Sequence, residues 1–329
     1  MASSILGVDI GGTKVAAGLV NDAGEILSHV RVPMMASGSG EEGFDSVSRA
    51  IDKAMESSAA QVRAIGVSSP GPLDPRRGVI LNSPNLPCWR NFPLLDAIEQ
   101  KYGLPTRVEN DANAAGLAEA IWGAGAAYQC LFYVTMGTGV GTAIIQNKRI
   151  YHGRTGLAAE GGHMTIDLNA AVGCGCGKRG CLESMVSGPA IARRGREHLS
   201  RSSGNGNASR VANLDLLTTE AIFEASEAGD LLSAGVIQET TDILALWLGN
   251  IIDLLEPDVI VLGGGVGARL SSWLPKIRAG IPGWTINPRS HEIPLLPARY
   301  RADSGLAGAA ALWLPNVALN QAVSQASSH

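Results

Sequence analysis

The chain has 329 residues, of which 45% are hydrophobic and 17% charged, and its formal net charge is −4 at pH 7. These values are typical of a compact globular protein with two lobes; they exclude a disordered chain and argue against a general nucleic-acid binder, which would carry a basic surplus. The start MASSILGVDI lacks the pattern of a signal peptide, so we expect a cytoplasmic protein that binds neither nucleic acid nor membranes.

The first third of the chain is predicted to alternate strands and helices. Residues 5–32 contain short apolar runs broken by GGT and NDAG, which predicts three strands linked as hairpins. Apolar residues at helical spacing predict a helix over 44–57. The next elements are a buried strand that runs into a proline-glycine loop (62–74), a helix ended by glycine (94–103), a strand (106–111) and a helix (113–125).

The rest of the chain repeats part of this pattern. Residues 130–151 again read as strand, glycine-threonine turn, strand, polar turn and strand, which suggests an internal duplication and two related lobes. The apolar run 243–255 is interrupted by Asp253 and is too short to span a membrane, so we expect a buried helix. The other predicted elements are helices near 187–199, 218–228 and 231–255, a buried strand at 258–262, a flexible loop at 201–210 and a polar tail over the last ten residues.

Three glycine-rich turns, at 9–13, 137–139 and 263–265, each follow an apolar strand directly. Glycine lets backbone N–H groups approach a phosphate closely, although a single turn of this kind is more often a plain connection. The sequence contains no G-x-x-x-x-G-K-[ST] motif, and GGGVG lacks the spacing of a dinucleotide-binding turn. Three such turns together therefore favour a nucleotide held between two lobes, each of which supplies a turn.

A second polar group, ENDAN at 109–113, lies where a predicted strand meets a predicted helix. One interpretation is that Asp111 or Asn113 caps the helix by accepting backbone N–H bonds. The other is that a carboxylate here accepts the proton of a substrate hydroxyl during phosphoryl transfer, while Asn110 offers both a donor and an acceptor. Both interpretations stay open, since different residues can serve them.

The strongest local signal is the cysteine segment VGCGCGKRGCLES at 172–184. Cys174, Cys176 and Cys181 follow a C-x-C-x4-C spacing, and His163 lies just upstream. One imidazole and three thiolates suit a closed tetrahedral zinc site, and a reducing compartment favours metal binding over disulfides. Four protein ligands leave no open position for catalysis, so we expect a structural zinc; ordinary buried cysteines would hardly cluster so closely.

Taken together, seven motifs are distributed in order along most of the chain. They are DIGGTK (9–14), SSPGPLD (68–74), ENDANAA (109–115), TMGTGVG (135–141), EGGHM (160–164), CGCGKRGCLE (174–183) and VLGGGVG (261–267). In these motifs the chain resembles the ROK family of sugar kinases and related repressors, which belongs to the actin-like ATPase superfamily. The resemblance implies a two-lobed α/β, actin-like (ribonuclease H-like) ATPase fold with a nucleotide and sugar cleft between the lobes. We place the lobes at 1–122 and 123–318, with a zinc-binding loop at 163–181 in the second, and the tail at 319–329.

The resemblance also implies roles for individual residues. Asp111 would be the general base that takes a proton from a sugar hydroxyl as it attacks the γ-phosphate of ATP, and His163 would bind both zinc and sugar. The residues implied at the sugar are Gly71, Asn85, Asn110, Asp111, Glu160, His163 and Glu183. Those implied at ATP are Asp9, Gly11, Gly12, Thr13, Lys14, Thr138, Gly139, Gly264 and Gly265, with Asp9 reaching Mg²⁺ through water. The zinc ligands would be His163, Cys174, Cys176 and Cys181.

The substrate is less sharply defined by these patterns. The stretch 84–94, PNLPCWRNFPL, resembles the corresponding part of glucokinases in the family, so we expect a glucokinase that phosphorylates the 6-hydroxyl of glucose. N-acetylmannosamine, N-acetylglucosamine and mannose remain alternatives, as does polyphosphate as the donor. A sugar sensor without catalysis is disfavoured by Asp111 and the phosphate turns, and a repressor by the missing helix-turn-helix segment ahead of Ile5. The family precedent implies a homodimer or homotetramer.

Overall fold

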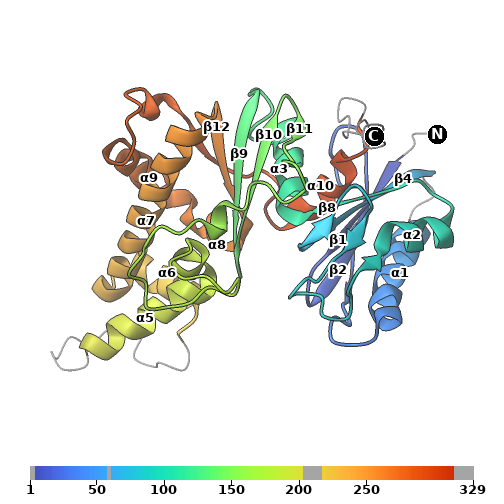
Figure 1. Cartoon of the computed structure of the whole chain (residues 1–329), viewed down its shortest axis with the longest axis horizontal. Helices are drawn as coiled ribbons and strands as arrows, with labels where there is room; N and C mark the ends of the chain where they lie inside the picture. The colour runs from blue at the N-terminus through green and yellow to red at the C-terminus, as the bar shows by residue number, and fades with distance from the viewer. Residues whose placement is uncertain (1–3, 58–60, 203–216, 315–329) are drawn as a thin grey trace, which may run out of the picture. The chain divides into compact units, whose positions relative to one another are not determined.

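The structure is a computed structural model that describes residues 4–57, 61–202 and 217–314 (Figure 1). The chain forms two compact units. Unit 1 contains Met1–Tyr133, Ala143–Ala159 and Arg299–His329, and unit 2 contains Val134–Thr142 and Glu160–Ala298. The chain thus passes between the units more than once, and the lobe limits expected from the sequence remain a prediction. The predicted tail and residues 203–210 of the predicted loop lie outside the described residues.

The first sheet has five strands in the order β3-β2-β1-β4-β8. β1 pairs antiparallel with β2, and β2 with β3, as expected for hairpin-linked strands, whereas β4 is parallel to both β1 and β8. The register places Asp9 beside Ser68, and Ser68 beside Glu109, at the carboxyl end of the parallel strands. The strands are β1 (Ser4–Ile10), β2 (Lys14–Val20), β3 (Val30–Pro33), β4 (Val62–Ser69) and β8 (Thr106–Asn110).

Helices cover both faces of this sheet (Figure 1). One face packs Leu6 and Val8 into a core with Ile51 and Ile98, and the other face packs against the C-terminal helix. A Cβ atom at Gly66 would collide with the backbone of that helix, so the helix lies directly on β4. The helices are α1 (Gly40–Glu56), α2 (Leu94–Tyr102), α3 (Asp111–Ile121) and α10 (Ser304–Ala311).

Several elements of unit 1 differ from the sequence expectation. α1 begins four residues early because Ser39 and Glu42 form a capping box. α10 was not predicted, because its run of small residues lacks an amphipathic pattern. A small sheet, also unpredicted, contains β5 (Leu73–Asp74), β6 (Val79–Ile80) and β7 (Phe92–Pro93).

The second sheet repeats the order of the first. Its strands run β11-β10-β9-β12-β13, so in both sheets a three-strand meander is extended by two later strands. This shared order agrees with the predicted duplication and with the three strands predicted over 130–151. The strands are β9 (Cys130–Met136), β10 (Val140–Gln146), β11 (Arg149–Ile150), β12 (Val259–Gly263) and β13 (Leu295–Pro297).

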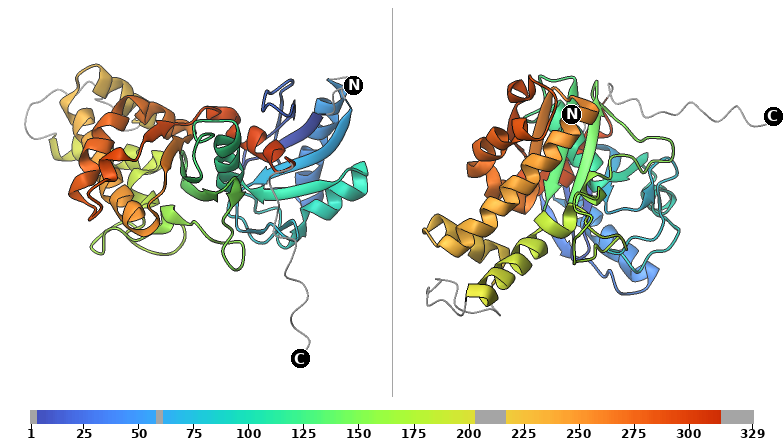
Figure 2. Two further views of the ribbon diagram at one scale, coloured as in Figure 1. Left: turned by 90° about the horizontal axis from the view of Figure 1, so that it is seen from above. Right: turned by 60° about the vertical axis from the view of Figure 1, so that its left-hand side comes forward.

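Unit 2 is built around the long helix α7, which packs against α5, α6 and α9. By length and composition alone, α7 is apolar enough to cross a membrane. Half of its most apolar stretch is buried inside the fold, as in the core helix of a globular unit. The two helices α5 and α7 lie side by side (Figure 2). The helices are α4 (Glu183–Val186), α5 (Gly188–Ser202), α6 (Thr219–Glu227), α7 (Leu231–Leu255), α8 (Gly264–Arg269) and α9 (Leu274–Gly280).

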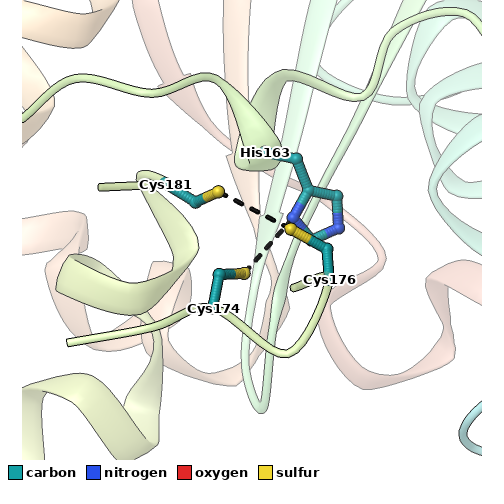
Figure 3. A group of neighbouring side chains, drawn as sticks. All are labelled: His163, Cys174, Cys176 and Cys181. Atoms are coloured by element: carbon teal, nitrogen blue, oxygen red, sulfur yellow. Dashed lines mark hydrogen bonds between the residues drawn. The ribbon is translucent and has the colours of Figure 1, made fainter. Parts of the chain in front are cut away.

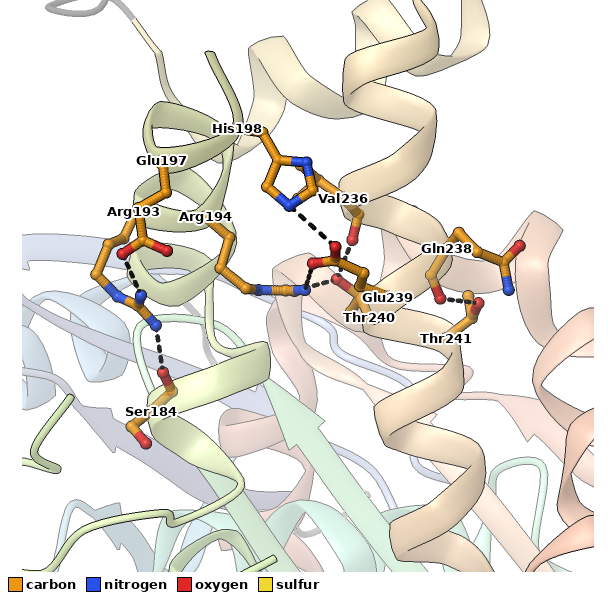
Figure 4. Close-up of polar contacts among 10 residues, drawn as sticks. All are labelled: Ser184, Arg193, Arg194, Glu197, His198, Val236, Gln238, Glu239, Thr240 and Thr241. Carbon is orange, nitrogen blue, oxygen red and sulfur yellow. Dashed lines mark hydrogen bonds and ion pairs between the residues drawn. The ribbon is translucent and has the colours of Figure 1, made fainter. Parts of the chain in front are cut away.

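A buried arginine joins α5 to α7. The guanidinium of Arg194 donates to Glu239 Oε2 at 3.1 Å and to the hydroxyl of Thr240, while His198 contacts the other carboxylate oxygen of Glu239 at 2.9 Å (Figure 4). Burial lowers the pKa of Arg194, and the nearby Glu239 carboxylate opposes this effect. These paired charges fix how the two helices lie against each other.

Candidate functional site

The carboxyl edge of the first sheet carries the carboxylate of Asp9, a partly buried residue. The hydroxyl of Ser68, on the neighbouring strand, donates a 3.0 Å hydrogen bond to Asp9 Oδ1. Burial raises the pKa of Asp9, while the Ser68 hydrogen bond and the charge of Lys14 lower it. A Cβ atom at Gly305 would collide with the Asp9 carboxylate, so the first turn of α10 also lies against it. A cation near this carboxylate would offset the cost of burying its charge.

The first glycine-rich turn follows Asp9 and connects β1 to β2. The N–H of Gly11 donates to the carbonyl of Lys14 at 2.9 Å, which closes the hairpin. A Cβ atom at Gly12 would lie 2.9 Å from the carbonyl oxygen of Asn85, so only a glycine fits beside that segment. The turn therefore lies directly against Asn85, which the sequence placed at the sugar. Thr13 is exposed.

Asp111 is the first residue of α3, and the helix cap is Asn110. The Asn110 Oδ1 atom accepts hydrogen bonds from the N–H groups of Ala112 at 3.0 Å and Asn113 at 3.3 Å. The interpretation of Asp111 or Asn113 as the cap was therefore wrong, since the strand ends one residue earlier than predicted. Asp111 is exposed whereas residues 112–120 are buried. Asp111 Oδ1 accepts a 2.8 Å hydrogen bond from the N–H of Ala112, and the exposed carboxylate at the head of the helix can accept a proton.

The proline-glycine loop after β4 lies beside this junction. A Cβ atom at Gly71 would lie 3.3 Å from Asn110 Nδ2. Gly71 and Asn110, both predicted to contact the sugar, are thus brought together although 39 positions separate them in the sequence. The close approach leaves little room for a side chain at residue 71.

Glu109 and His152, for which no sequence pattern predicts a role, are in contact in the structure. The Nε2 atom of His152 lies 2.6 Å from Glu109 Oε2, and Glu109 is 1% exposed. The only sequence signal for Glu109 is an acidic residue at the end of an apolar strand, two positions before Asp111 in ENDAN. No spacing rule connects His152 to it, because the pairing arises only when β11 and β8 are brought close in the fold.

In unit 2, the predicted zinc ligands lie together (Figure 3). The ligand atoms of His163, Cys174, Cys176 and Cys181 all lie within 4.8 Å of one another. Cys174 Sγ is 3.5 Å from His163 Nδ1, and Cys176 Sγ is 3.7 Å from Cys181 Sγ. A tetrahedral zinc with bonds of about 2.3 Å to sulfur and about 2.0 Å to nitrogen separates its ligands by roughly 3.5 to 3.8 Å. The donor set and its spacing therefore fit a zinc ion.

The loop that carries these ligands is held by backbone contacts. Lys178 Nζ donates to the carbonyl of His163 at 2.7 Å, and the N–H of Cys174 donates to the carbonyl of Lys178 at 2.8 Å. Gly177 and Gly180 have φ values of 88° and 70°, which other residues rarely adopt. The sequence pattern of glycines between the cysteines is thus explained by the turns that bring the sulfurs together.

The thiols of this loop differ in acidity. Burial raises the pKa of Cys174 to about 12, and the acceptor Glu183 adds to this effect. Partial desolvation also acts on Cys176, but the Lys178 N–H and the neighbouring thiols hold the pKa of Cys176 below its usual value. A divalent cation would be needed to hold all three sulfurs as thiolates.

Two carboxylates adjoin the cluster. Glu183 Oε1 lies 3.5 Å from Cys174 Sγ, and Glu183 Oε2 accepts a 2.9 Å hydrogen bond from the N–H of Val140. Glu160 directly precedes the short helix η1 (Gly161–His163). Partial burial raises the pKa of Glu160, with Glu183 adding to the effect and His163 opposing it. Both carboxylates can accept hydrogen bonds from hydroxyl groups.

The two other glycine-rich turns also lie in unit 2. The Gly137 carbonyl accepts a 2.8 Å bond from the N–H of Gly188, and Thr138 is exposed. Gly264 has a φ of 80°, and a Cβ atom there would collide with the backbone of Met136, so the turns after β9 and β12 touch. Gly265 has open space around it. Backbone groups of this kind can approach a phosphate or a nucleoside.

Each unit thus carries its own set of the predicted site residues. Unit 1 holds Asp9, Gly11, Gly12, Thr13, Lys14, Gly71, Asn85, Asn110 and Asp111, and unit 2 holds Thr138, Gly139, Glu160, His163, Cys174, Cys176, Cys181, Glu183, Gly264 and Gly265.

Comparison with known proteins places this arrangement among related ones. The family model described as "ROK family" matches residues 5–316. A glucokinase of Halalkalibacterium halodurans is 32% identical over 306 residues, covering 92% of each chain. An N-acetylmannosamine kinase of Yersinia pseudotuberculosis is also 32% identical, over 94% of this chain and 97% of that one. The crystal structure of a ROK family glucokinase from Streptomyces griseus, in complex with glucose and AMPPNP, matches with a TM-score of 0.81 and 34% identity, over 94% of this chain and 98% of that one.

Proposed function

The chain belongs to the ROK family and has its actin-like ATPase fold, and we propose that it is an ATP-dependent glucokinase. The enzyme transfers the γ-phosphoryl group of ATP to the 6-hydroxyl of glucose. The observation that carries this proposal is the exposed carboxylate of Asp111 at the head of α3, in a chain similar along nearly its whole length to glucokinases. A general base at this point is what a hydroxyl acceptor requires.

The reaction is an in-line displacement at phosphorus. The oxygen of the sugar 6-hydroxyl attacks the γ-phosphorus, the bond from phosphorus to the bridging β,γ-oxygen breaks, and ADP leaves with those electrons. Asp111 accepts the proton of the attacking hydroxyl. Asn110 holds the backbone of this junction through its cap bonds, and this backbone carries Asp111.

The other sugar hydroxyls would be bound by residues that offer complementary donors and acceptors. Glu160 and Glu183 accept hydrogen bonds from hydroxyl groups, and Asn110 offers both a donor and an acceptor. Gly71 and Asn85 would line the same pocket. Polar groups that are paired with hydroxyls discriminate strongly against ligands that lack them.

We assign a structural zinc ion to His163, Cys174, Cys176 and Cys181. When bound, zinc cross-links the loop and neutralises its thiolates without taking part in phosphoryl transfer. His163 turns Nδ1 toward the sulfurs, so Nε2 is left on the far side of the ring for a sugar hydroxyl (Figure 3). The loop thereby orients His163 and Glu183 together.

ATP would be held by backbone groups of the glycine-rich turns. The residues assigned to the phosphates are Gly11, Gly12, Thr13, Lys14, Thr138 and Gly139, and those assigned to the adenosine are Gly264 and Gly265. Asp9 would hold Mg²⁺ through water, since Mg²⁺ keeps much of its hydration shell and its charge would offset the burial of this carboxylate.

The alternative is an N-acylhexosamine kinase, and the Yersinia relative supports it at the same identity as the glucokinase. A panel of glucose, mannose, N-acetylglucosamine and N-acetylmannosamine, each with ATP or polyphosphate and Mg²⁺, tests the proposal by ADP or phosphate-ester formation. We expect the highest kcat/KM with glucose and ATP. A higher kcat/KM with an N-acetyl sugar than with glucose would show that the N-acetyl sugar is the substrate. Sugar binding without turnover would indicate a sensor.

The setting of the enzyme is proposed on the same basis. Reduced cysteines and a supply of ATP are features of the cytoplasm, which is where we place the protein. A homodimer or homotetramer, with no nucleic-acid or membrane partner, remains our prediction. Sedimentation of the purified protein tests the oligomeric state.

A further inference from the structure

Glu109 is a buried carboxylate two positions before the proposed base in the sequence. It is 1% exposed, and its oxygens are contacted by three hydrogen-bonding groups. Oε1 accepts a 2.8 Å bond from the backbone N–H of Asn110 and a 3.0 Å bond from Asn113 Nδ2. These two partners lie on either side of Asp111 in the sequence. The position of the Glu109 side chain is therefore coupled to the backbone that carries Asp111.

His152 holds the other oxygen of this carboxylate. Its Nε2 atom lies 2.6 Å from Glu109 Oε2, and the His152 side chain is 14% exposed. The tautomer of the imidazole decides which of the two atoms donates. A hydrogen bond is electrostatically stronger in a buried setting than in water. The pair thus restrains the carboxylate oxygen of Glu109 that Asn110 and Asn113 do not contact.

The backbone around His152 is itself restrained. The carbonyl of His152 accepts hydrogen bonds from the N–H groups of Gly156 at 3.1 Å and Ala158 at 3.3 Å, and the N–H of Tyr151 donates to Ile144 at 2.9 Å. His152 is therefore fixed by the end of β11 and by the turn that follows. A residue whose backbone is restrained in this way can hold the Glu109 carboxylate in place.

We propose that His152 and Glu109 are positioning residues for Asp111. The hydrogen bond between them holds the junction of β8 and α3 so that the Asp111 carboxylate meets the attacking hydroxyl. This inference rests on the proposed role of Asp111 as the base. Neither residue touches the substrate in this role: Glu109 is buried, and it acts through Asn110 and Asn113. Small misplacements of a reacting group cost large factors in rate, so loss of the bond should lower kcat.

Two amide variants of His152 separate positioning from general stability. In His152→Gln the side-chain nitrogen reaches the place of Nε2, whereas in His152→Asn it is one methylene short. We expect kcat of His152→Asn to fall by about 10- to 100-fold, with KM for glucose and for ATP changed by less than about threefold. His152→Gln should keep kcat within about threefold of the unaltered enzyme. Both variants should have similar melting temperatures.

The same substitution in an Asp111→Asn background shows whether His152 acts through the base. There His152→Asn should cause almost no further loss, because the group that it positions is absent. Equal kcat values for the two His152 variants, or an undiminished loss in the Asp111→Asn background, would overturn the inference and leave the proposed function intact. Full turnover of Asp111→Asn itself would instead refute the proposed base, and the inference with it.

Discussion

Glu183 connects the cysteine cluster to a glycine-rich turn in the same unit. One oxygen of its carboxylate lies 3.5 Å from Cys174 Sγ, and the other accepts a 2.9 Å hydrogen bond from the N–H of Val140. Val140 directly follows the turn at 137–139, which we assign to the ATP phosphates. The Glu183 side chain thus joins a proposed sugar-binding loop to a proposed phosphate-binding turn. Its displacement should therefore weaken glucose binding.

Substitution of glycine in this turn tests that connection. A Cβ atom at Gly139 would lie 2.6 Å from Glu183 Oε2, whereas one at Gly137 meets nothing within 4 Å. Gly139→Ala should push the carboxylate aside and raise KM for glucose by about tenfold, and Gly137→Ala is the matched control with an unchanged value. Steady-state kinetics at saturating ATP measure both. An equal effect of the two substitutions would show that Glu183 is not involved.

Asp111→Asn should lower kcat by about 10²- to 10⁴-fold, because an amide cannot accept the proton of the sugar hydroxyl. Glucose affinity, measured by calorimetry, should change little, since the amide keeps the size of the side chain. Asp96→Asn is the control: Asp96 is likewise an exposed acid in the first turn of a helix, α2. Turnover is followed by ADP release, and an active Asp111→Asn variant would remove the residue from the mechanism.

Elemental analysis of the purified protein should find about one zinc per chain. Cys176→Ser should lose the metal, melt at a lower temperature and bind glucose more weakly, because the loop that orients His163 and Glu183 is no longer cross-linked. Cys88→Ser should keep the zinc, since Cys88 lies in unit 1 and the cluster lies in unit 2. A metal-free protein with full glucose affinity would contradict the assignment.

Asn110 has one role that the structure shows, capping α3, and one that we propose, binding sugar. Serine is an equally good cap, so Asn110→Ser should preserve stability while weakening glucose binding. Asn110→Ala loses both roles and should cost about 1 kcal/mol of unfolding free energy in addition. Denaturant unfolding and calorimetry separate the two effects. Equal glucose affinity of Asn110→Ser and the unaltered enzyme would limit Asn110 to the cap.

The pKa of Asp9 gives a prediction about stability and pH. Burial raises this pKa above its ordinary value of 3.8, so the folded state binds the proton more tightly than the unfolded state does. The ionised carboxylate therefore destabilises the metal-free fold, and the effect grows as pH rises from 3.8 through the raised pKa. Asp9→Asn still accepts the Ser68 bond and carries no charge.

Metal-free Asp9→Asn should consequently melt higher than the unaltered protein at neutral pH, and the difference should shrink as the pH is lowered toward 3.8. Its activity with Mg²⁺ and ATP should fall sharply, since the proposed contact to Mg²⁺ is lost. Thermal melts at several pH values in chelator measure the first effect. A variant that melts lower throughout would show that the ionised form is favoured by the fold.

The local patterns that the sequence carries were sufficient for most strands and helices. Apolar runs broken by glycine turns predicted the meander of β1, β2 and β3, and the spacing of the cysteines predicted the cluster with His163. α10 was not predicted, because its alanine and glycine residues show no amphipathic period. The cap of α3 was predicted at Asp111 or Asn113, whereas it is Asn110. In each case the element either lacks a clear sequence pattern or depends on an interaction with a residue distant in the chain.

The sequence by itself therefore determined the features that involve only nearby residues. These are the carboxylates after strands, the glycine turns and the metal-binding spacing, and together they identified the family. The attachment of Glu109 to His152, the contact of Gly71 with Asn110 and that of Glu183 with Val140 were decided by the tertiary structure alone. The physical reason is that such contacts depend on strand register and on how buried elements pack, which bring together residues without any fixed spacing in the sequence.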